Sequence, residues 1–283
     1  MENSSLRQPP EIVMVDSINY LMPEHAGMTV LAGSHGGLYS AYKALSLGVR
    51  SVILNDAGVG LDEAGIASLT YGDAAGLPVA AIAHSSARIG DAGDMRRRGR
   101  ISHANRAAAV LGVQAGMACD DALERLHAAG PAAASAATVA EHRHEQPLLG
   151  RRIVCIDSAS LIKPEDRGGI VVTGSHGGLI GGDAAKAMNV AVRFAAFNDA
   201  GVGTDAAGIG RLEPLDRLGI AAVTVAHHSA RIGDALSTYE QGVISHVNVH
   251  ADALGFRPGA RLATCLWQWL ATDRAAALTE GEA

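Results

Sequence analysis

Short clusters of histidine, serine, aspartate and arginine are the residues of this sequence that could carry chemistry. Residues 33–37 (Gly-Ser-His-Gly-Gly) place a hydroxyl and an imidazole among glycines, and residues 55–56 supply an amide and a carboxylate. Residues 84–91 add a histidine, an arginine and an aspartate. An imidazole with a pKa near neutral suits proton transfer, and a guanidinium fork suits capture of a carboxylate or phosphate. The clusters therefore predict acid–base chemistry on a small anion.

These clusters occur twice along the chain, in the same order. Residues 33–38 recur letter for letter at 174–179, 55–60 at 198–203, 86–91 at 229–234 and 101–103 at 244–246. The offset is 141 residues for the first cluster (174 − 33) and 143 for the second (198 − 55), so a two-residue insertion lies between them. The chain is therefore a tandem duplication, and its two halves can be compared with each other.

That comparison separates packing from chemistry. Apolar positions vary between the halves but stay apolar: Val52–Leu54 corresponds to Ala195–Phe197, a change that a core tolerates. The polar clusters do not vary. Turn formation accounts for glycine, asparagine and aspartate at such positions, but it does not require histidine or arginine. We therefore expect the clusters to form a site.

The clusters supply three groups of predicted site residues. The predicted catalytic residues are His84, His227, Asp56, Asp199, His35 and His176. The predicted substrate-binding residues are Ser34, Gly36, Gly37, Asn55, Arg88, Asp91, Ser175, Gly177, Gly178, Asn198, Arg231 and Asp234. We expect His103 and His246 to hydrogen-bond to these site residues without touching the substrate themselves. We expect Ser102 to cap a helix.

Apolar runs alternate with Ala-rich segments, which predicts alternating strands and helices. In the first half we expect strands at 12–15, 28–32, 50–54 and 79–83, with helices at 38–48, 62–76 and 101–111. In the second half we expect strands at 153–156, 170–173, 192–197 and 221–226, with helices at 179–189, 205–218, 242–254 and 259–274. The polar clusters begin where predicted strands end, which is the edge of a parallel sheet where ligands bind.

This pattern predicts an α/β fold: a tandem duplication of a Rossmann-like parallel-sheet unit, with the two halves related by a pseudo-two-fold axis. We assign residues 12–127 to the first repeat, 128–151 to a linker and 152–274 to the second repeat. His142 and His144 fall in the linker and are expected to be solvated. The final helix carries Trp267 and Trp269, which could bury at a subunit contact, so we expect a homo-oligomer.

Composition narrows the function classes. The 23 basic and 29 acidic residues give a net charge of −6, which argues against a nucleic-acid partner. No apolar run reaches the length of a membrane span, and the N-terminus does not resemble a signal peptide, so we expect a cytoplasmic protein without a membrane partner. The three cysteines lie outside the clusters and do not predict a disulfide framework.

An organic cofactor is not expected. Residues 58–60 (Gly-Val-Gly) resemble part of a dinucleotide fingerprint, but the strands that follow end in His84 and His227 rather than in an acidic residue. The phosphate-binding loop Gly-x-x-x-x-Gly-Lys-Ser/Thr is absent. His35, Asp56, His84 and Asp91 would make an acceptable ligand set for a divalent metal, but an arginine within the cluster would repel a cation. We therefore predict no metal ligands and keep a divalent metal as an alternative.

The favoured function is a cofactor-independent enzyme that acts on a small anionic metabolite, a carboxylate, amide or lactam. Histidine and aspartate would move protons and arginine would bind the anion, with hydrolysis as the first expectation. A lyase or a two-base isomerase with its site between the repeats is an alternative, in which His35 and His176 approach opposite faces of one carbon. A non-catalytic anion- or nucleotide-binding protein with one pocket per repeat is another.

Overall fold

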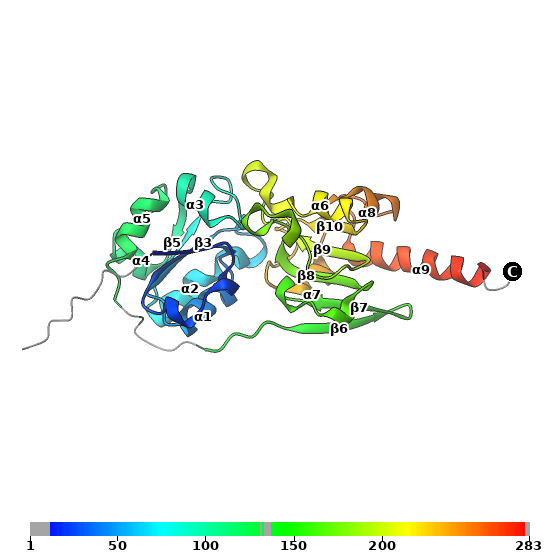
Figure 1. Ribbon diagram of the computed structural model, residues 1–283, viewed down its shortest axis with the longest axis horizontal. Coiled ribbons are helices and arrows are strands. Elements are labelled where there is room, and N and C mark those ends of the chain that lie inside the picture. Colours follow the sequence, from blue (N-terminus) through cyan, green and yellow to red (C-terminus); the bar gives the residue numbers. More distant parts are fainter. Residues whose placement is uncertain (1–11, 131, 133–136, 281–283) are drawn as a thin grey trace, which may run out of the picture.

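The computed structural model describes residues 12–130, 132 and 137–280, which form a mixed α/β structure with two sheets (Figure 1). The first unit (residues 12–130) contains β1 (Ile12–Val15), β2 (Thr29–His35), α1 (Leu38–Ser46), β3 (Ser51–Asn55), α2 (Ala67–Ala75), β4 (Val79–Ile82), α3 (Ala92–Arg98), β5 (Ile101–Ala104), α4 (Arg106–Val110) and α5 (Cys119–Leu126). The second unit (residues 137–280) contains β6 (Arg143–Leu148), β7 (Arg151–Ile156), β8 (Ile170–His176), β9 (Phe194–Asn198), α6 (Leu212–Arg217), β10 (Ala221–Val225), α7 (Ala235–Gln241), β11 (Ile244–Val247), α8 (Val249–Ala253) and α9 (Leu262–Glu280).

Both sheets are mostly parallel. In the first sheet β1 to β4 are parallel neighbours and β5 is antiparallel to β4. In the second sheet β7 to β10 are parallel, and the antiparallel strands β6 and β11 form its two edges. Strand order follows chain order in each sheet, whereas a Rossmann sheet reverses its order at a switch point. The α/β class and the two sheets agree with the sequence prediction, but a Rossmann-like repeat is not confirmed.

Both faces of the first sheet are buried, which explains why its strands are apolar throughout. Leu31 and Ile53 face a core that includes Met95 of α3 and Leu123 of α5. The strand residues that alternate with these, such as Val52, point to the opposite face and pack in a second core that contains alanines of α1 and α2. Successive strand residues point to opposite faces, so a strand covered on both sides needs apolar residues at every position.

The predicted helix at 101–111 is wrong in its first half, where the chain forms β5. Asn105 caps α4: its side-chain oxygen accepts hydrogen bonds from the backbone N–H groups of Ala108 (2.9 Å) and Val79 (3.0 Å). The helix therefore begins after Asn105, and Ser102 lies in a strand rather than at a helix cap. The predicted helix at 242–254 fails in the same way, since β11 precedes the cap residue Asn248.

The predicted helix at 179–189 is also wrong. The chain there forms two single 3₁₀ turns, Ile180–Gly182 and Ala184–Lys186. Gly181 and Gly182 have φ angles of 64° and 69°, which an α-helix cannot accommodate. The corresponding segment of the first unit is the regular helix α1, so the two units differ in the interval that contains the two-residue insertion.

Two further segments differ from expectation. Residues 62–76 and 205–218 begin as 3₁₀ turns, Leu61–Ile66 and Thr204–Ile209, and become α-helical only in α2 and α6. The segment expected as a linker contains β6, which pairs with β7 along its whole length. Trp269 of α9 packs in the core against Phe194, with ring centroids 5.8 Å apart, while Trp267 is exposed. The oligomeric state stays a prediction, which light scattering can test.

The two units pack through the loops that follow their parallel strands (Figure 1). The contacts occur in reciprocal pairs. The backbone N–H of Thr204 donates to the carbonyl of His84, and that of Leu61 donates to the carbonyl of His227, both at 2.9 Å. An apolar cluster between the units contains Ala57, Ala64, Ile89, Ala200 and Ile232. These contacts across the interface are thus repeated with the two units exchanged, as in an isologous dimer.

Candidate functional site

The loop after β3 holds an unusual backbone conformation that explains one repeated cluster. Ala57, Gly58, Val59 and Gly60 all have positive φ angles, between 49° and 75°, and residues 200–203 repeat this. The side-chain oxygens of Asn55 and Asp56 accept the N–H groups of Ala57 (2.9 Å) and Gly58 (3.1 Å) and so fix the turn. A β-branched residue at positive φ is rare and costs free energy. The Asn-Asp pair is therefore needed to form this part of the interface.

Two histidine–aspartate dyads lie beside these loops. Oδ1 of Asp56 accepts the backbone N–H of His84 at 2.9 Å and lies 2.8 Å from His84 Nδ1. In the second unit, Oδ1 of Asp199 contacts the backbone N–H of His227 at 2.9 Å and its Nδ1 at 3.0 Å. A carboxylate at Nδ1 places the ring proton there and leaves Nε2 as a proton acceptor.

The electrostatics of the first dyad follow from this pairing. The hydrogen bond that His84 donates to Asp56 raises the pKa of His84 above its ordinary value, against the opposing effect of burial. Burial acts to raise the pKa of Asp56, but hydrogen bonds from His84 and Ser102 outweigh it and the pKa is lowered. His103 Nδ1 lies 3.0 Å from the Ser102 hydroxyl, so a chain of polar contacts runs from His103 to His84.

The corresponding chain in the second unit is different. Burial raises the pKa of Asp199, and hydrogen bonds from His227 and Ser245 more than offset this and lower it. The Ser245 hydroxyl lies 3.0 Å from that of Thr224. The buried Nδ1 of His246 has no hydrogen-bond partner within the described part of the chain. His246 therefore does not repeat the contact that His103 makes.

Each dyad faces the other unit rather than a cavity. A Cβ atom added to Gly201 would lie 2.7 Å from Cδ2 of His84, and one added to Gly58 would lie 2.9 Å from Cδ2 of His227. Only glycine lets the opposite ring approach so closely. Each imidazole is about 30% exposed at its side chain. The dyads therefore form part of the contact between the units.

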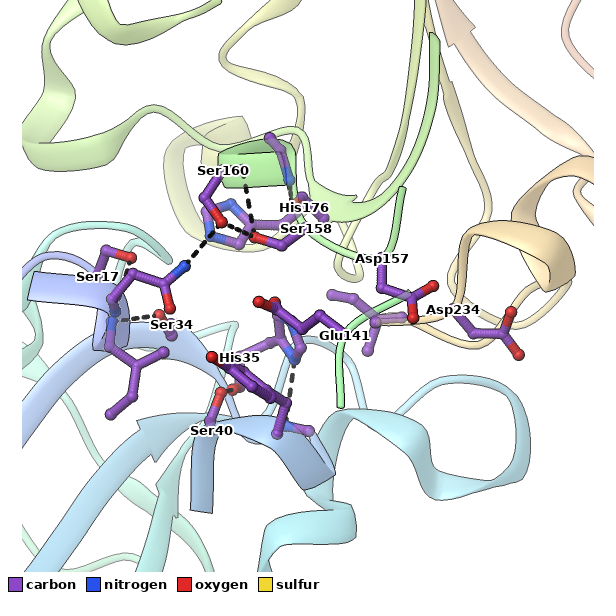
Figure 2. Close-up of a pocket in the computed structure, with 18 of the residues that line it drawn as sticks. Ser17, Ser34, His35, Ser40, Glu141, Asp157, Ser158, Ser160, His176 and Asp234 are labelled. Atoms are coloured by element: carbon purple, nitrogen blue, oxygen red, sulfur yellow. Dashed lines mark hydrogen bonds between the residues drawn. The ribbon is translucent and has the colours of Figure 1, made fainter. Parts of the chain in front are cut away.

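A cavity of about 640 Å³ lies between the units at another point of the interface (Figure 2). The predicted site residues that line it are Ser34, His35, Gly37, Ser175, His176, Arg231 and Asp234. The predicted residues that are not among its lining are His84, His227, Asp56, Asp199, Gly36, Asn55, Arg88, Asp91, Gly177, Gly178, Asn198, His103 and His246. The structure thus divides the predicted set between the cavity and the rest of the interface.

His35 and His176 meet in this cavity. Their ring centroids are 6.4 Å apart and the rings are nearly perpendicular, at 81°. Nδ1 of each ring accepts a hydrogen bond from the backbone N–H two residues later, Gly37 or Gly178, at 3.1 Å. A neutral ring that accepts at Nδ1 carries its proton on Nε2. Both imidazoles are therefore set up as Nε2–H donors.

Burial keeps both imidazoles neutral. It lowers the pKa of His35 to about 4. It also lowers the pKa of His176 well below the ordinary value, and the nearby charge of Arg211 adds to this effect. This is the opposite of the shift at His84. The same residue type thus has two electrostatic roles at one interface.

The cavity serines hold the backbone in place. The hydroxyl of Ser34 accepts the N–H of Ile18 at 2.8 Å, and that of Ser175 accepts the N–H of Ala159 at 2.9 Å. These bonds tie the loops after β1 and β7 to the neighbouring strands. Burial raises the pKa of the Cys119 and Cys155 thiols to about 12, so both stay protonated. These groups are therefore not placed as activated nucleophiles.

Glu141 is a cavity residue that sequence reasoning missed. It precedes β6, in the segment expected to be a linker, and Figure 2 shows it reaching into the cavity. His142 anchors the segment through two contacts with Oδ2 of Asp157: its backbone N–H at 2.8 Å and its Nδ1 at 3.0 Å. Burial raises the pKa of Glu141, as does repulsion from Asp157, against hydrogen bonds from Ser158 and Tyr39. A carboxyl group with a raised pKa in a cavity is suited to proton transfer.

Arg211 is a second cavity residue that sequence reasoning missed. It immediately precedes α6 and is only 5% exposed. Its Nε donates to the carbonyl of Gly178 at 3.0 Å, and its guanidinium carbon lies 5.2 Å from the centre of the Phe197 ring. No repeated motif contains this position, because the corresponding residue of the first unit is Ser68.

The arginines predicted from the motifs are engaged in ion pairs between the units. Arg88 binds Asp205 at 2.8 Å, and Arg231 binds Asp62 at 2.9 Å. Arg231 also contacts Asp234, which caps α7 by accepting the N–H of Ser237. The equivalent Asp91 caps α3. Capping and ion pairing thus provide structural reasons for the repetition of these residues.

The part of this cavity beside Gly233 has an equivalent beside Gly90 that is filled. A Cβ added to Gly233 would have His35 Cε1 of the cavity as its nearest neighbour, at 3.4 Å. One added to the equivalent Gly90 would collide with the carbonyl oxygen of Leu179. The 3₁₀ turn after Leu179 is fixed there because Gly181 N–H donates to the Gly90 carbonyl at 2.7 Å. The segment after Leu179 therefore occupies beside Gly90 the space that is open beside Gly233.

Searches for other ligand sites and for relatives add no further constraint. Across residues 12–130, 132 and 137–280, no three His, Cys, Asp or Glu side chains are placed to hold a metal ion. No helix in that part of the chain combines the length and apolar character needed to cross a bilayer. Comparison with protein-family models, curated proteins and solved structures gives no match. The function is therefore inferred from the geometry of the cavity.

Proposed function

We propose that the protein is an enzyme without an organic cofactor that moves a proton on a small anionic carbonyl compound bound in the interface cavity. The observation that carries this proposal is the His35–His176 pair, with each Nδ1 bound to a backbone N–H. Two neutral Nε2–H donors in one cavity can stabilise an oxygen that gains negative charge. Neutral imidazole serves this purpose in triosephosphate isomerase, where it polarises the carbonyl of the substrate.

Glu141 is the group best suited to act as the base. Its carboxylate takes the proton from the carbon next to the substrate carbonyl, and the C–H electron pair moves to the carbonyl oxygen. The resulting enolate accepts hydrogen bonds from Nε2–H of His35 and His176. Where the deprotonated carbon carries a hydroxyl, return of the proton to the former carbonyl carbon, with the hydroxyl proton moving to the enolate oxygen, gives an isomer. Where the carbon beyond it carries a leaving group, the enolate electrons re-form the carbonyl, a carbon–carbon double bond forms and the group departs with its bonding pair, which is a lyase reaction.

The contacts in the cavity favour an isomerase or lyase over the hydrolase expected from the sequence. Ser34 and Ser175 are engaged by backbone N–H groups and are not hydrogen-bonded to the imidazoles in the contacts described above. The same geometry argues against His35 and His176 as two opposed bases, because each carries a proton on Nε2 and uses Nδ1 as an acceptor. Proton abstraction is therefore assigned to Glu141.

In this proposal the two units are related by a pseudo-two-fold axis, which the reciprocal contacts of Thr204 with His84 and of Leu61 with His227 support. The dyads stabilise the joint between the units. The proposed site is the cavity between the repeats, rather than one pocket in each repeat.

Hydrogen–deuterium exchange tests the proposal directly. Small 2-oxo and 2-hydroxy carboxylates are incubated with the protein in D₂O, and proton NMR follows loss of the C–H signal next to the carbonyl. Glu141→Gln should lower the exchange rate by about 10²- to 10⁴-fold, the usual contribution of a positioned base. Its fold should be unchanged, because glutamine can keep the hydrogen bonds with Tyr39 and Ser158.

A histidine outside the cavity, with the same kind of backbone contact as His35 and His176, provides a control variant. His25 also accepts a backbone N–H at Nδ1, from Met22 at 3.0 Å, but does not line the cavity. His25→Gln should therefore leave the exchange rate unchanged. Exchange that is equally fast in Glu141→Gln and wild type would remove the proposed base. Ligand binding at a stoichiometry of one with no exchange in any compound would identify a binding protein instead.

A further inference from the structure

Arg211 is a buried cation whose contacts leave its charge unbalanced. Its Nε donates to the Gly178 carbonyl at 3.0 Å, and Nη1 donates to the carbonyls of Lys186 (3.3 Å) and Ala187. All three acceptors are neutral. Within the described residues, no carboxylate lies within salt-bridge distance of this guanidinium. Burial lowers the pKa of Arg211 to about 10, so the group is still charged at neutral pH.

Burial of a charge without a counter-charge is costly, and such groups are normally paired. Arg211 lines the cavity near His176, and its charge is felt by that imidazole. We infer that Arg211 is the residue that binds the substrate's anionic group, and that this group is a single carboxylate. The inference rests on the proposed function for the location of the substrate, and it adds the group that recognises the substrate and its charge.

Several of the other charged side chains around the cavity already have partners, among them Lys186, which lies 4.0 Å from Asp183. Arg231 is held by Asp62 at 2.9 Å and by Asp234 at 3.2 Å. Asp157 is held by His142 at 3.0 Å. A bound anion with a single negative charge would neutralise the positive charge of Arg211. A dianion such as a phosphate ester would bring a second negative charge toward Asp157, Asp234 and Glu141, while the cations Arg231 and Lys186 of the lining already lie within 4.0 Å of carboxylates.

Comparison of the two units supports a role for Arg211 in the open cavity. Ser68 occupies the equivalent position in the first unit, and its buried hydroxyl has no hydrogen-bond partner among the described residues. The backbone contact at this position is the same in both units, since the N–H of Ser68 donates to Gly36 and that of Arg211 to Gly177. The fold therefore does not require arginine here. Arginine is present only in the unit whose α6 borders the open cavity.

Ligand-observed NMR can test the inference without any catalytic activity. The probes are propanoate and 2-oxopropanoate, their neutral amides, and inorganic phosphate. Wild-type protein should bind the carboxylates at least about 10-fold more tightly than the amides and than phosphate, since a hydrogen bond to a charged group is worth about that factor. Arg211→Gln should remove this preference. Arg217→Gln, which removes an exposed charge from the same helix, should keep it.

Arg211 also fixes the turn that contains Lys186, so Arg211→Gln could fail to fold. Arg211→Lys keeps the charge but loses the planar fork, and should still weaken carboxylate binding by about 10-fold. Equal binding of carboxylate and amide to wild type would overturn the inference, as would undiminished carboxylate binding to the folded variants. Carboxylate binding that depends on Arg211, without deuterium exchange, would support Arg211 as the carboxylate-binding residue and reject the proposed reaction. Deuterium exchange with an unchanged KM in Arg211→Lys would support the proposed reaction and reject Arg211 as the carboxylate-binding residue.

Discussion

The open space beside Gly233, which is part of the cavity, and the filled space beside Gly90 arise from two copies of the same motifs. On the open side α1 is a regular helix, and Gly233 has the His35 ring as its neighbour. On the filled side the segment after Leu179 turns into the space and hydrogen-bonds to Gly90. The repeated residues build the interface in both places, while the differences decide which place can hold a ligand. Duplication thus preserves the shared contacts, while the segment after Leu179 fills beside Gly90 a space that stays open beside Gly233.

The largest expected effect separates the two kinds of histidine at this interface. His35→Ala or His176→Ala should each lower the deuterium-exchange rate by about 10²- to 10³-fold, the usual effect of removing an oxyanion donor. His84→Gln and His227→Gln should leave the rate within a few-fold of wild type, because neither ring lines the cavity. Rates measured on folded variants make the comparison. If the dyad variants lose activity and the cavity variants do not, the catalytic site lies at the dyads.

The second prediction compares the two sides through one pair of glycines. Gly90 and Gly233 have φ angles of 83° and 84°, so alanine is strained equally at both positions, by about 1–2 kcal/mol. Only Gly90 also faces the Leu179 carbonyl, so Gly90→Ala should lower the free energy of unfolding by about 1–3 kcal/mol more than Gly233→Ala. Urea denaturation gives both values. Equal losses of unfolding free energy in the two variants would mean that the turn after Leu179 shifts to make room for the added methyl group.

The sequence predicted the parallel strands β1 to β4 and β7 to β10 because they are apolar throughout, and it missed the antiparallel strands β5, β6 and β11. It also placed the polar clusters correctly at the ends of β2, β3 and β4. The helices at 101–111 and 179–189 failed for tertiary or backbone reasons. Pairing with β4 converts residues 101–104 into a strand, and the glycine pair at 181–182 prevents helix formation. Alanine content alone could not reveal either effect.

The sequence predicted only part of the site, because site residues were recognised by their repetition in both halves of the chain. Repetition between the halves selects residues that both units need, and both units need the interface. His35 and His176 satisfy that criterion and also line the cavity. Glu141 precedes β6, outside the repeated motifs, and Arg211 corresponds to Ser68, so neither is repeated. An asymmetric cavity needs residues that the comparison of repeats discards.

The third prediction concerns pH and has opposite signs for the two kinds of histidine. The pKa of folded His35 is about 4, below the unfolded value of about 6.5. Its contribution to stability is therefore present above pH 6.5 and is lost as the pH falls toward 4. The pKa of His84 is raised, so its contribution is present below pH 6.5 and is lost as the pH rises through the folded value.

Histidine NMR titrations and urea denaturation between pH 4 and 8 test this pair of signs. His35→Gln should flatten the loss of stability on the acid side, and His84→Gln should flatten the loss on the alkaline side. A His35 resonance that titrates near 6.5 in the folded protein would show that the cavity is well hydrated. The neutral-imidazole mechanism would then lose its physical basis.

The smallest expected effect distinguishes the two interface arginines. Arg88 and Asp205 are both 46% exposed, and the Arg231 side chain is 39% exposed, so loss of either ion pair should change Tm only slightly and less in high salt. Arg231 lines the open cavity and Arg88 does not. Arg231→Ala should therefore weaken carboxylate binding, because it releases Asp62 and Asp234 as unbalanced negative charges near the ligand. Arg88→Ala should leave binding unchanged. A similar binding loss in both variants would mean that the arginines act through the packing of the two units, and the open and filled sides would then be coupled rather than independent.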